Sequence, residues 1–412
     1  MTTQQPEVIA AMAAQINSAV SRRRLLQVAG IGGAAMVASA CGAGGGEVAG
    51  GGSTATGSAS EPAAVTDFSD TEKVVNWSNW PLYLDIDEAS GTYPSLVAFQ
   101  DATGIEVTYT EDINDNNEFY AKVRTQLEQG QDIGRDLVIL TDWMAALWIQ
   151  SGFAQKLDKS LIPNSVNLIP RLADVAFDKP REYSLPWQSG FGGLGYNVPK
   201  LEAAIGKSSI KTLDELFDPA LKGRVTLLSE MRDTMGCILA WKGYDPSNFT
   251  DAQFEEAIAA LTQQVDSGQV RQVTGNDYIA AMESGDVIAV IGWSGDIFAL
   301  GDDFNFNLPE SGGMLWTDNM LVPAMARHKK NAELLMNYYY DPAVAAQVAA
   351  YVTYICPVQG AQAEMEKIDP ALASNEFIFP SEATLSNSFV FMELTPEQNE
   401  KYEGLFQRAI GN

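Results

Sequence analysis

The 412-residue chain contains very little histidine, because His328 is the only one. Histidine is the most frequent general base and a common metal ligand, so its scarcity argues against Ser-His or Cys-His enzymes and against His-based metal sites. His328 stands inside Arg327-His328-Lys329-Lys330, which we interpret as a solvated basic run. Enzymes that use a pair of carboxylates, such as glycosidases, remain possible.

Positive charge and cysteine are also scarce. The chain has 26 Lys and Arg against 53 Asp and Glu, a formal net charge of -27. This balance argues against nucleic acid as a partner, which requires clustered basic side chains, and is compatible with a cationic ligand. Beyond Cys41, the residues Cys237 and Cys356 could form a disulfide outside the cytoplasm or be two small buried thiols. No glycine-rich phosphate loop is present, and we expect no metal ion and no cofactor.

The apolar stretch near the N-terminus is too short to span a bilayer. Leu25–Ala40 has 16 residues, whereas a spanning helix needs about 20. It follows Ser21-Arg22-Arg23-Arg24-Leu25-Leu26, a twin-arginine export box, and it ends in small residues. Residues 1–40 are therefore predicted to be a signal peptide for the Tat route, which places the protein in the periplasm or on the outer face of the cytoplasmic membrane.

Cys41 is the predicted site of a lipid anchor. Val37-Ala38-Ser39-Ala40-Cys41 resembles a lipobox, although Ala38 stands where Leu is preferred and Ala38-Ser39-Ala40 also suits ordinary cleavage. The residues that follow are almost entirely Gly, Ala, Ser and Thr, a composition typical of a flexible tether. A tether directly behind a cysteine favours lipidation at Cys41, with 41–69 as anchor and linker.

The remaining chain alternates between β-branched apolar runs and amphipathic segments. This alternation predicts an α/β fold with helices on both faces of mostly parallel sheets. The predicted strands are Lys73–Trp77, Ile105–Tyr109, Asp136–Leu140, Gly193–Asn197, Arg224–Leu228 and Val287–Ile291. The predicted helices are Glu118–Glu128, Met144–Ser151, Leu213–Phe217, Asp251–Val265 and Tyr278–Ser284.

Tryptophans and acids follow the ends of several predicted strands. In open α/β sheets a ligand binds in the crevice beyond the carboxyl ends of the strands, so these side chains are candidates to line it. The candidates lie in Asn79-Trp80-Pro81-Leu82-Tyr83, Thr141-Asp142-Trp143, Ser229-Glu230-Met231-Arg232-Asp233 and Trp293-Ser294-Gly295-Asp296, with a further pair in Trp316-Thr317-Asp318.

An aromatic box with acids at its ends suits a flexible diamine or polyamine. Indole faces pack along methylene groups and attract ammonium groups, with about 1–2 kcal/mol for a well-placed cation–π contact. Carboxylates pair with the ammonium ends through charge-assisted hydrogen bonds. Arg232 is the only basic residue in the cluster, and we expect it to hold Asp233 or a neighbouring acid rather than to touch the ligand.

Each candidate also has a purely structural interpretation. Glu230 and Asp233 could be acids of a first helical turn with Ser229 as its N-cap, stabilised by the helix dipole alone. Each tryptophan taken singly could be a core residue, and Asp318 could simply open a strand. The repetition of tryptophan with acid at strand ends favours a ligand site.

Short motifs that are specific in combination extend over the chain. They are Asn79-Trp80 with Tyr83, Thr103-Gly104-Ile105-Glu106-Val107, Tyr120-Ala121-Lys122, Asp136-Leu137-Val138, Gln155-Lys156-Leu157-Asp158-Lys159-Ser160, Tyr183-Ser184-Leu185-Pro186-Trp187, Gly312-Gly313 with Trp316-Thr317-Asp318, and Val344–Tyr354. Through these motifs the chain resembles, from about Val74 to Arg408, the spermidine/putrescine-binding proteins of bacterial polyamine ABC transporters.

The resemblance implies a set of ligand-binding residues. Thr141 replaces a serine of the family, Trp143 a tyrosine, and Phe391 or a neighbour a glutamine. The implied aromatic platforms are Trp80, Tyr83, Trp143, Trp293, Trp316 and Tyr354, and the implied amine-binding acids are Glu230, Asp233 and Asp318.

The resemblance also implies a two-lobed clamp of the type II periplasmic-binding-protein class, with the ligand cleft between the lobes. Residues 70–191 plus 318–362 are expected to form lobe 1, and residues 192–317 plus 363–412 lobe 2. The implied function is non-enzymatic: polyamine capture and delivery to an ABC transporter permease in the membrane. The alternatives are a binder of another small cationic solute and an extracytoplasmic carboxylate-based hydrolase.

Overall fold

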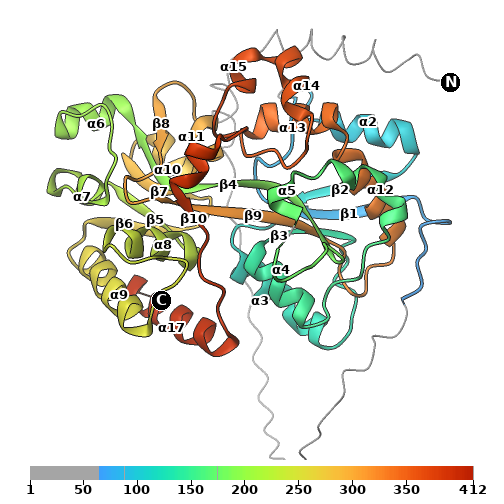
Figure 1. Ribbon diagram of the computed structural model, residues 1–412, viewed down its shortest axis with the longest axis horizontal. Coiled ribbons are helices and arrows are strands. Elements are labelled where there is room, and N and C mark those ends of the chain that lie inside the picture. Colours follow the sequence, from blue (N-terminus) through green and yellow to red (C-terminus); the bar gives the residue numbers. More distant parts are fainter. Residues whose placement is uncertain (1–64, 88, 174, 412) are drawn as a thin grey trace, which may run out of the picture.

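Two long strands, β4 (Ser184–Asn197) and β9 (Gly313–Leu321), run through the middle of the protein and are buried along their whole length. They pair antiparallel with each other (Figure 1). The computed structural model describes residues 65–411 except 88 and 174. The predicted signal peptide, the lipidation site at Cys41 and most of the linker lie outside the described residues.

Each edge of this central pair continues into three parallel strands. On one side β9 is followed by β3, β1 and β2, and on the other side β4 is followed by β7, β5 and β6. The contacts from β9 to β3 and from β4 to β7 are antiparallel, whereas the outer strands pair in parallel. The bounds are β1 (Val74–Asn79), β2 (Glu106–Glu111), β3 (Leu137–Thr141), β5 (Val225–Leu228), β6 (Val270–Thr274), β7 (Ala289–Trp293), β8 (Phe304–Asn307), which pairs with β4, and β10 (Ser388–Phe389), which pairs with β9.

The result is a two-lobed α/β fold in which one sheet passes through both lobes (Figure 1). The prediction of parallel strands is confirmed for the outer trios, while the antiparallel central pair was not predicted. Parallel strands require helices on both faces, so they consist of continuous apolar runs; Leu137–Leu140 in β3 is wholly buried.

Helices cover both faces of the sheet (Figure 1). The helices near β1–β3 are α2 (Pro94–Thr103), α3 (Asn116–Glu128), α4 (Asp142–Gln150), α5 (Pro170–Ala173), α12 (Lys329–Tyr339) and α13 (Pro342–Val352). The helices near β5–β7 are α6 (Val198–Ile205), α7 (Leu213–Leu216), α8 (Met231–Trp241), α9 (Asp251–Asp266), α10 (Tyr278–Ser284), α11 (Ser294–Ala299) and α17 (Pro396–Ile410). The others are α14 (Ala361–Ile368), α15 (Pro370–Ala373), α16 (Glu382–Ser386) and the short 3-10 helices Lys159–Leu161, Pro163–Asn167 and Pro219–Leu221.

Side-chain caps explain where two helices that matter for the site begin. The Asp115 side chain accepts hydrogen bonds from the backbone N–H groups of Asn117 and Glu118, which starts α3. The C-terminal helix α17 opens with a capping box between Thr395 and Gln398.

His328 does not lie in a solvated run, and that prediction is wrong. Its side chain is buried at the N-terminal end of α12, with Nδ1 3.0 Å from Asp136 Oδ1 and Nε2 2.9 Å from Glu72 Oε2. Burial alone would lower the pKa of His328, but the hydrogen bonds to Glu72 and Asp136 outweigh it and raise the pKa. The basic neighbours in the sequence gave no sign of these acids, which come from distant segments.

The two cysteines beyond Cys41 are thiols. Within the described part of the chain, Cys237 and Cys356 are both buried and free, which decides between the two alternatives that the sequence left open. Among the described residues, no helix has the length and apolar composition that crossing a membrane would require.

Candidate ligand-binding site

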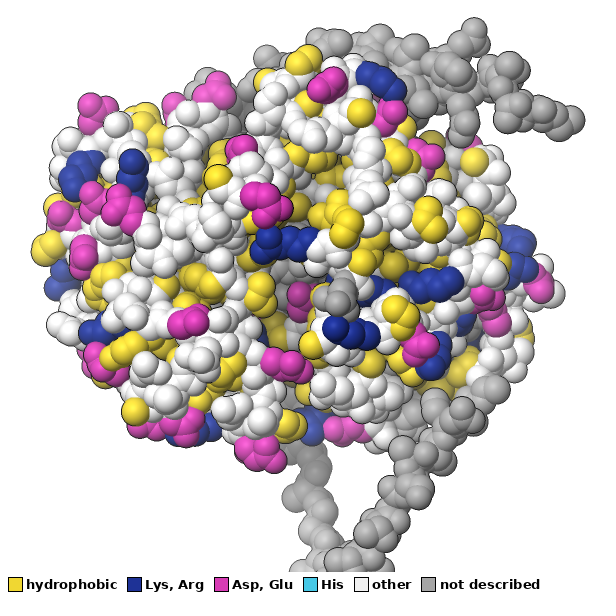
Figure 2. Space-filling model, viewed as in Figure 1, with side chains coloured by type: hydrophobic (Ala, Val, Ile, Leu, Met, Phe, Trp, Pro, Cys, Tyr) yellow, Lys and Arg dark blue, Asp and Glu magenta, His cyan; other side chains and the backbone are white. Residues whose placement is uncertain are grey.

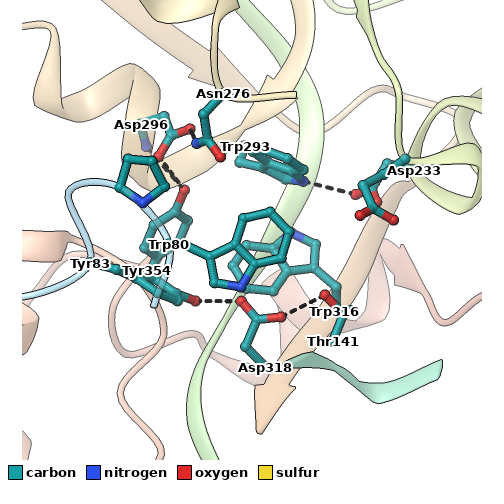
Figure 3. Close-up of a pocket in the computed structure, with 12 residues that line it drawn as sticks. Trp80, Tyr83, Thr141, Asp233, Asn276, Trp293, Asp296, Trp316, Asp318 and Tyr354 are labelled. Atoms are coloured by element: carbon teal, nitrogen blue, oxygen red, sulfur yellow. Dashed lines mark hydrogen bonds between the residues drawn. The ribbon is translucent and has the colours of Figure 1, made fainter. Parts of the chain in front are cut away.

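A cavity of about 380 Å³, including its open mouth, lies where the carboxyl ends of the outer strands meet the central pair (Figure 3). All the predicted ligand-binding residues except Trp143 line it. The lining residues are Trp80, Pro81, Tyr83, Thr141, Glu230, Asp233, Asn276, Trp293, Asp296, Trp316, Asp318 and Tyr354.

The aromatic side chains of the cavity come from both sides of the central strands. The rings of Trp80, just after β1, and Trp293, at the end of β7, meet edge to face with centroids 6.0 Å apart. Tyr354 packs edge-on against Trp316 at 5.2 Å and against Tyr83 at 5.4 Å. Such T-shaped packing leaves ring faces available for alkyl chains and cations.

Glycines in β4 make room for these side chains. A Cβ atom at Gly190 would press on the Trp316 ring and lie 2.8 Å from Tyr354 Cδ1. A Cβ atom at Gly192 would lie 2.8 Å from Asp233 Oδ1. β4 therefore places no side chain at Gly190 and Gly192, the two positions that contact residues of the cavity.

Asp318 is the acid supplied by β9. Its Oδ1 accepts a hydrogen bond of 2.7 Å from Thr141 Oγ1, and its Oδ2 accepts one of 2.9 Å from Tyr83 Oη (Figure 3). Asp318 and Thr141 are register partners between β9 and β3. Burial raises the pKa of Asp318 to about 7, even though both hydrogen bonds oppose the shift.

Asp296 forms a second acidic position, in the first turn of α11. Its carboxylate accepts hydrogen bonds from Tyr354 Oη at 2.7 Å, Tyr278 Oη at 2.8 Å and Asn276 Nδ2 at 2.8 Å. Burial raises the pKa of Asp296 to about 6, against the effect of these donors. The motif that contains Asp296 was recognised in the sequence, but the residue was not among the predicted ligand-binding acids.

Glu230 and Asp233 lie at the start of α8. Glu230 Oε1 accepts 2.8 Å hydrogen bonds from both the backbone N and Nδ2 of Asn116. Asp233 Oδ1 accepts one of 3.1 Å from Trp293 Nε1. Burial, followed by the charge of Asp115, raises the pKa of Glu230 well above its ordinary range, and burial raises that of Asp233 to about 7.

The alternative in which Ser229 caps this helix is wrong. The helix begins at Met231, so Glu230 occupies the N-cap position, and its side chain makes no capping bond. Ser229 Oγ instead donates to Asp115 Oδ2 at 2.8 Å. Glu230 is therefore held by another helix, α3, and not by its own.

Trp143 lies outside the cavity lining, beside Arg232. The Arg232 guanidinium carbon lies 4.0 Å from the centroid of the Trp143 ring. Arg232 Nη2 donates to Asn399 Oδ1 at 2.8 Å, and Nη1 lies 3.6 Å from Glu403 Oε1. Arg232 thus lies outside the cavity lining, and its ion-pair partner is Glu403 of α17 rather than the expected Asp233.

Phe391 also lies outside the lining. Its ring centroid is 5.9 Å from the Arg232 guanidinium carbon, and the side chain is buried. Three lining residues were missed as candidates, Pro81, Asn276 and Asp296. Asn276 follows β6, a strand that was not predicted, and so gave no strand-end signal.

The charged groups that line the site are all acidic. Its lining residues, all in the described part of the chain, carry four carboxyl groups and include no Lys, Arg or His. Among the described residues, Trp316 Nε1 is buried without a hydrogen-bond partner. Such a cavity can hold an organic cation, whereas an anion would meet carboxylates without a compensating donor cluster.

Comparison with known proteins identifies the family. The sequence pattern described as "Bacterial extracellular solute-binding protein" matches residues 95–375. The chain belongs to this family.

Relatives within the family include binding proteins from several bacteria. The spermidine/putrescine-binding periplasmic protein of Escherichia coli K12 is 27% identical over 323 residues, which cover 77% of this chain and 86% of that protein. The putrescine-binding periplasmic protein SpuD of Pseudomonas aeruginosa is 27% identical over 358 residues, which cover 83% and 92%. The structure of the spermidine/putrescine ABC transporter substrate-binding protein PotD of Streptococcus pneumoniae, 23% identical, superimposes with a TM-score of 0.65 over 82% of this chain and 98% of that one, and thus shares the fold.

Proposed function

We propose that this protein is the extracytoplasmic substrate-binding component of an ABC importer, and that it binds a polyamine such as putrescine or spermidine in the cavity between its lobes. The observation that carries the proposal is the set of four buried carboxyl groups around an aromatic box without a basic lining residue. The names of the relatives, which are spermidine- and putrescine-binding proteins, support the same ligand class.

The aromatic and acidic residues have distinct roles in this proposal. Trp80, Trp293 and Trp316 pack along the methylene chain, and the carboxylates of Asp318, Asp296 and the Glu230–Asp233 pair receive the ammonium groups. Because buried ion pairs gain affinity only when every partner is satisfied, the hydrogen bonds that already orient each carboxylate favour tight binding. The ligand's cost of desolvation is then offset by preformed partners.

The charge of the whole molecule favours the same ligands. Asp and Glu side chains are spread over both lobes on the face shown in Figure 2, and the formal net charge is -27. A negative potential raises the local concentration of cations and their association rate.

We further propose that the lobes are residues 70–191 plus 318–362 and residues 192–317 plus 363–412, so that the boundaries run through β4 and β9. Ligand would drive closure by binding the closed form more tightly than the open one. The closed form would then be recognised by permease subunits in the membrane, with the chain held nearby through a lipid on Cys41 after Tat export.

A thermal shift assay tests the proposed ligand class. We expect putrescine, spermidine or both to raise the Tm at millimolar concentration, and maltose to leave it unchanged. Stabilisation by glycine betaine alone would instead favour the alternative of another small cationic solute. Stabilisation by maltose without any effect of the polyamines would favour the carboxylate-based hydrolase and would reject our proposal.

A further inference from the structure

A chain of hydrogen bonds connects two of the cavity acids through a residue that does not line the cavity. Asn116 Nδ2 donates to Thr141 Oγ1 and to Glu230 Oε1, each at 2.8 Å. Thr141 Oγ1 in turn donates to Asp318 Oδ1 at 2.7 Å. The two hydrogens of one amide group thus link Asp318 to Glu230, and Asn116 is fully buried.

This series of hydrogen bonds crosses from one trio of outer strands to the other. Thr141 ends β3 and Asn116 begins α3, both on the β1 side of the central pair, whereas Glu230 follows β5 on the other side. The residues that flank Asn116 cross in the same way. Asp115 accepts a hydrogen bond from Ser229, and Asn117 Nδ2 donates to Glu403 Oε1 at 3.4 Å.

The amide of Asn116 is not required to form its own helix. The N-cap of α3 is Asp115, whose carboxylate satisfies the first free N–H groups of the helix. The backbone N–H of Asn116 is itself directed to Glu230 Oε1 at 2.8 Å, and its Oδ1 accepts from the backbone N–H of Thr141 at 3.2 Å. The backbone N–H and the side-chain amide of Asn116 therefore bond to Glu230 on one side of the cleft and to Thr141 on the other.

We propose that Asn116 is a positioning residue that fixes the separation of Asp318 and Glu230 when the lobes close, and thereby sets the length of diamine that the cavity accepts. The inference rests on the proposed function for its ligand. The methylene count of a linear diamine sets the greatest separation that its two charges can reach, so two acids held at one separation favour the length that spans it when extended. Without Asn116, Asp318 and Glu230 would change position independently of each other, and the preference for one diamine length would weaken.

Titration calorimetry with 1,3-diaminopropane, putrescine and cadaverine tests this proposal on the full-length protein and its variants. We expect the unsubstituted protein to prefer one length by at least tenfold over the next best. Asn116→Ala should weaken binding of the preferred diamine at least tenfold and reduce the preference to less than threefold. Thr125→Ala, at an exposed position of the same helix, should leave both the affinity and the preference within threefold.

A double variant tests whether Asn116 acts through the proposed chain. Thr141→Val interrupts the chain at its next link, so Asn116→Ala combined with Thr141→Val should lose little selectivity beyond either single change. Additive losses of selectivity, or an Asn116→Ala variant that weakens all three diamines equally with the preference intact, would overturn the proposal and leave Asn116 with a structural role only.

Failure of the proposed function can be recognised separately. If the unsubstituted protein binds none of the diamines, the proposed ligand class is wrong. The hydrogen-bonded link from Asn116 to Glu230 is then tested by hydrogen exchange at the Asn116 backbone amide in the ligand-free protein. Faster exchange in a Glu230→Ala variant than in the unsubstituted protein would support Asn116 as the link across the cleft for another ligand. Equal exchange rates would overturn it.

Discussion

Tyr354 donates a 2.7 Å hydrogen bond from its Oη to Asp296 Oδ1, and so joins the segment after α13 to the first turn of α11. The same ring forms part of the aromatic wall beside Trp316 and Tyr83. One side chain therefore builds the wall of the cavity and orients an acid in it. Burial raises the pKa of Asp296 to about 6, and the Tyr354 hydroxyl is the strongest influence that opposes this rise.

Tyr354→Phe should consequently weaken polyamine binding in a pH-dependent way. Loss of the hydroxyl removes a donor that favours the ionised carboxylate, so the pKa of Asp296 rises further. We expect affinity to fall about fivefold at pH 7, which corresponds to about 1 kcal/mol. The deficit should shrink at pH 8.5, where Asp296 is ionised in both proteins. Calorimetry at the two pH values measures this, and a deficit of equal size at both would show that the hydroxyl does not act through Asp296.

Removal of one charge from the cavity acids should weaken binding strongly. Asp318→Asn and Glu230→Gln keep the size of each side chain but remove the ammonium partner. We expect each to raise the Kd for the preferred polyamine at least about tenfold, or 1.4 kcal/mol. Asp101→Asn, which removes the same charge from an exposed position on α2, serves as the matched control and should bind normally. If both cavity variants also bind normally, the acids are wrongly assigned.

Binding should release protons near neutral pH. Burial raises the pKa values of Asp233 and Asp318 to about 7 and that of Asp296 to about 6, so these groups are partly protonated in the empty cavity. An amine ligand stays cationic until pH approaches about 10 and requires ionised partners. Affinity should therefore rise from pH 5 to pH 8. Titrations at pH 6.5 in phosphate and in Tris should differ in apparent enthalpy, because the released protons are taken up by the buffer; identical enthalpies would contradict proton release.

The same shifts predict how Asp318 affects stability without ligand. Its pKa is raised from an ordinary 3.8 to about 7 on folding, so between these values the folded protein retains a proton that the unfolded chain has lost. Its contribution to the free energy of unfolding is therefore greatest at low pH and declines as pH rises towards 7. In Asp318→Asn this decline is absent, so the Tm of the variant relative to the unsubstituted protein should increase from pH 4.5 to pH 7.5. A constant Tm difference by calorimetry would exclude the shift.

The predicted helices and strands were accurate where a single period or an apolar run decides the structure. The predictions Asp251–Val265 and Tyr278–Ser284 correspond to α9 and α10 within one residue, because amphipathic spacing and local caps suffice there. By contrast β9, which carries Trp316 and Asp318, was not predicted. Its mixed polar and apolar sequence is buried on both faces, and its polar side chains find their partners in segments distant in the sequence, as Asp318 does with Tyr83 and Thr141.

The site, like the fold, combines residues that local sequence predicts with residues that only distant contacts place. A tryptophan or acid directly after an apolar run is visible in the sequence, so most lining residues could be named in advance. Trp143 met the same criterion, yet it packs on Arg232. Asn116 lay outside the predicted helix start, and its partner Glu230 is 114 residues away in the chain, so no local pattern could have indicated it.

The sequence by itself indicated the class of chemistry: one histidine, an excess of acid and repeated tryptophan-acid pairs argue against histidine-based catalysis and favour an organic cation. These are properties of composition and short spacing, which do not depend on how the chain closes. Only the tertiary structure decided which acids meet, how they are oriented and how far their pKa values rise. Those features arise because strands distant in sequence end at one place and exclude water from it, and desolvation exists only once the walls are assembled.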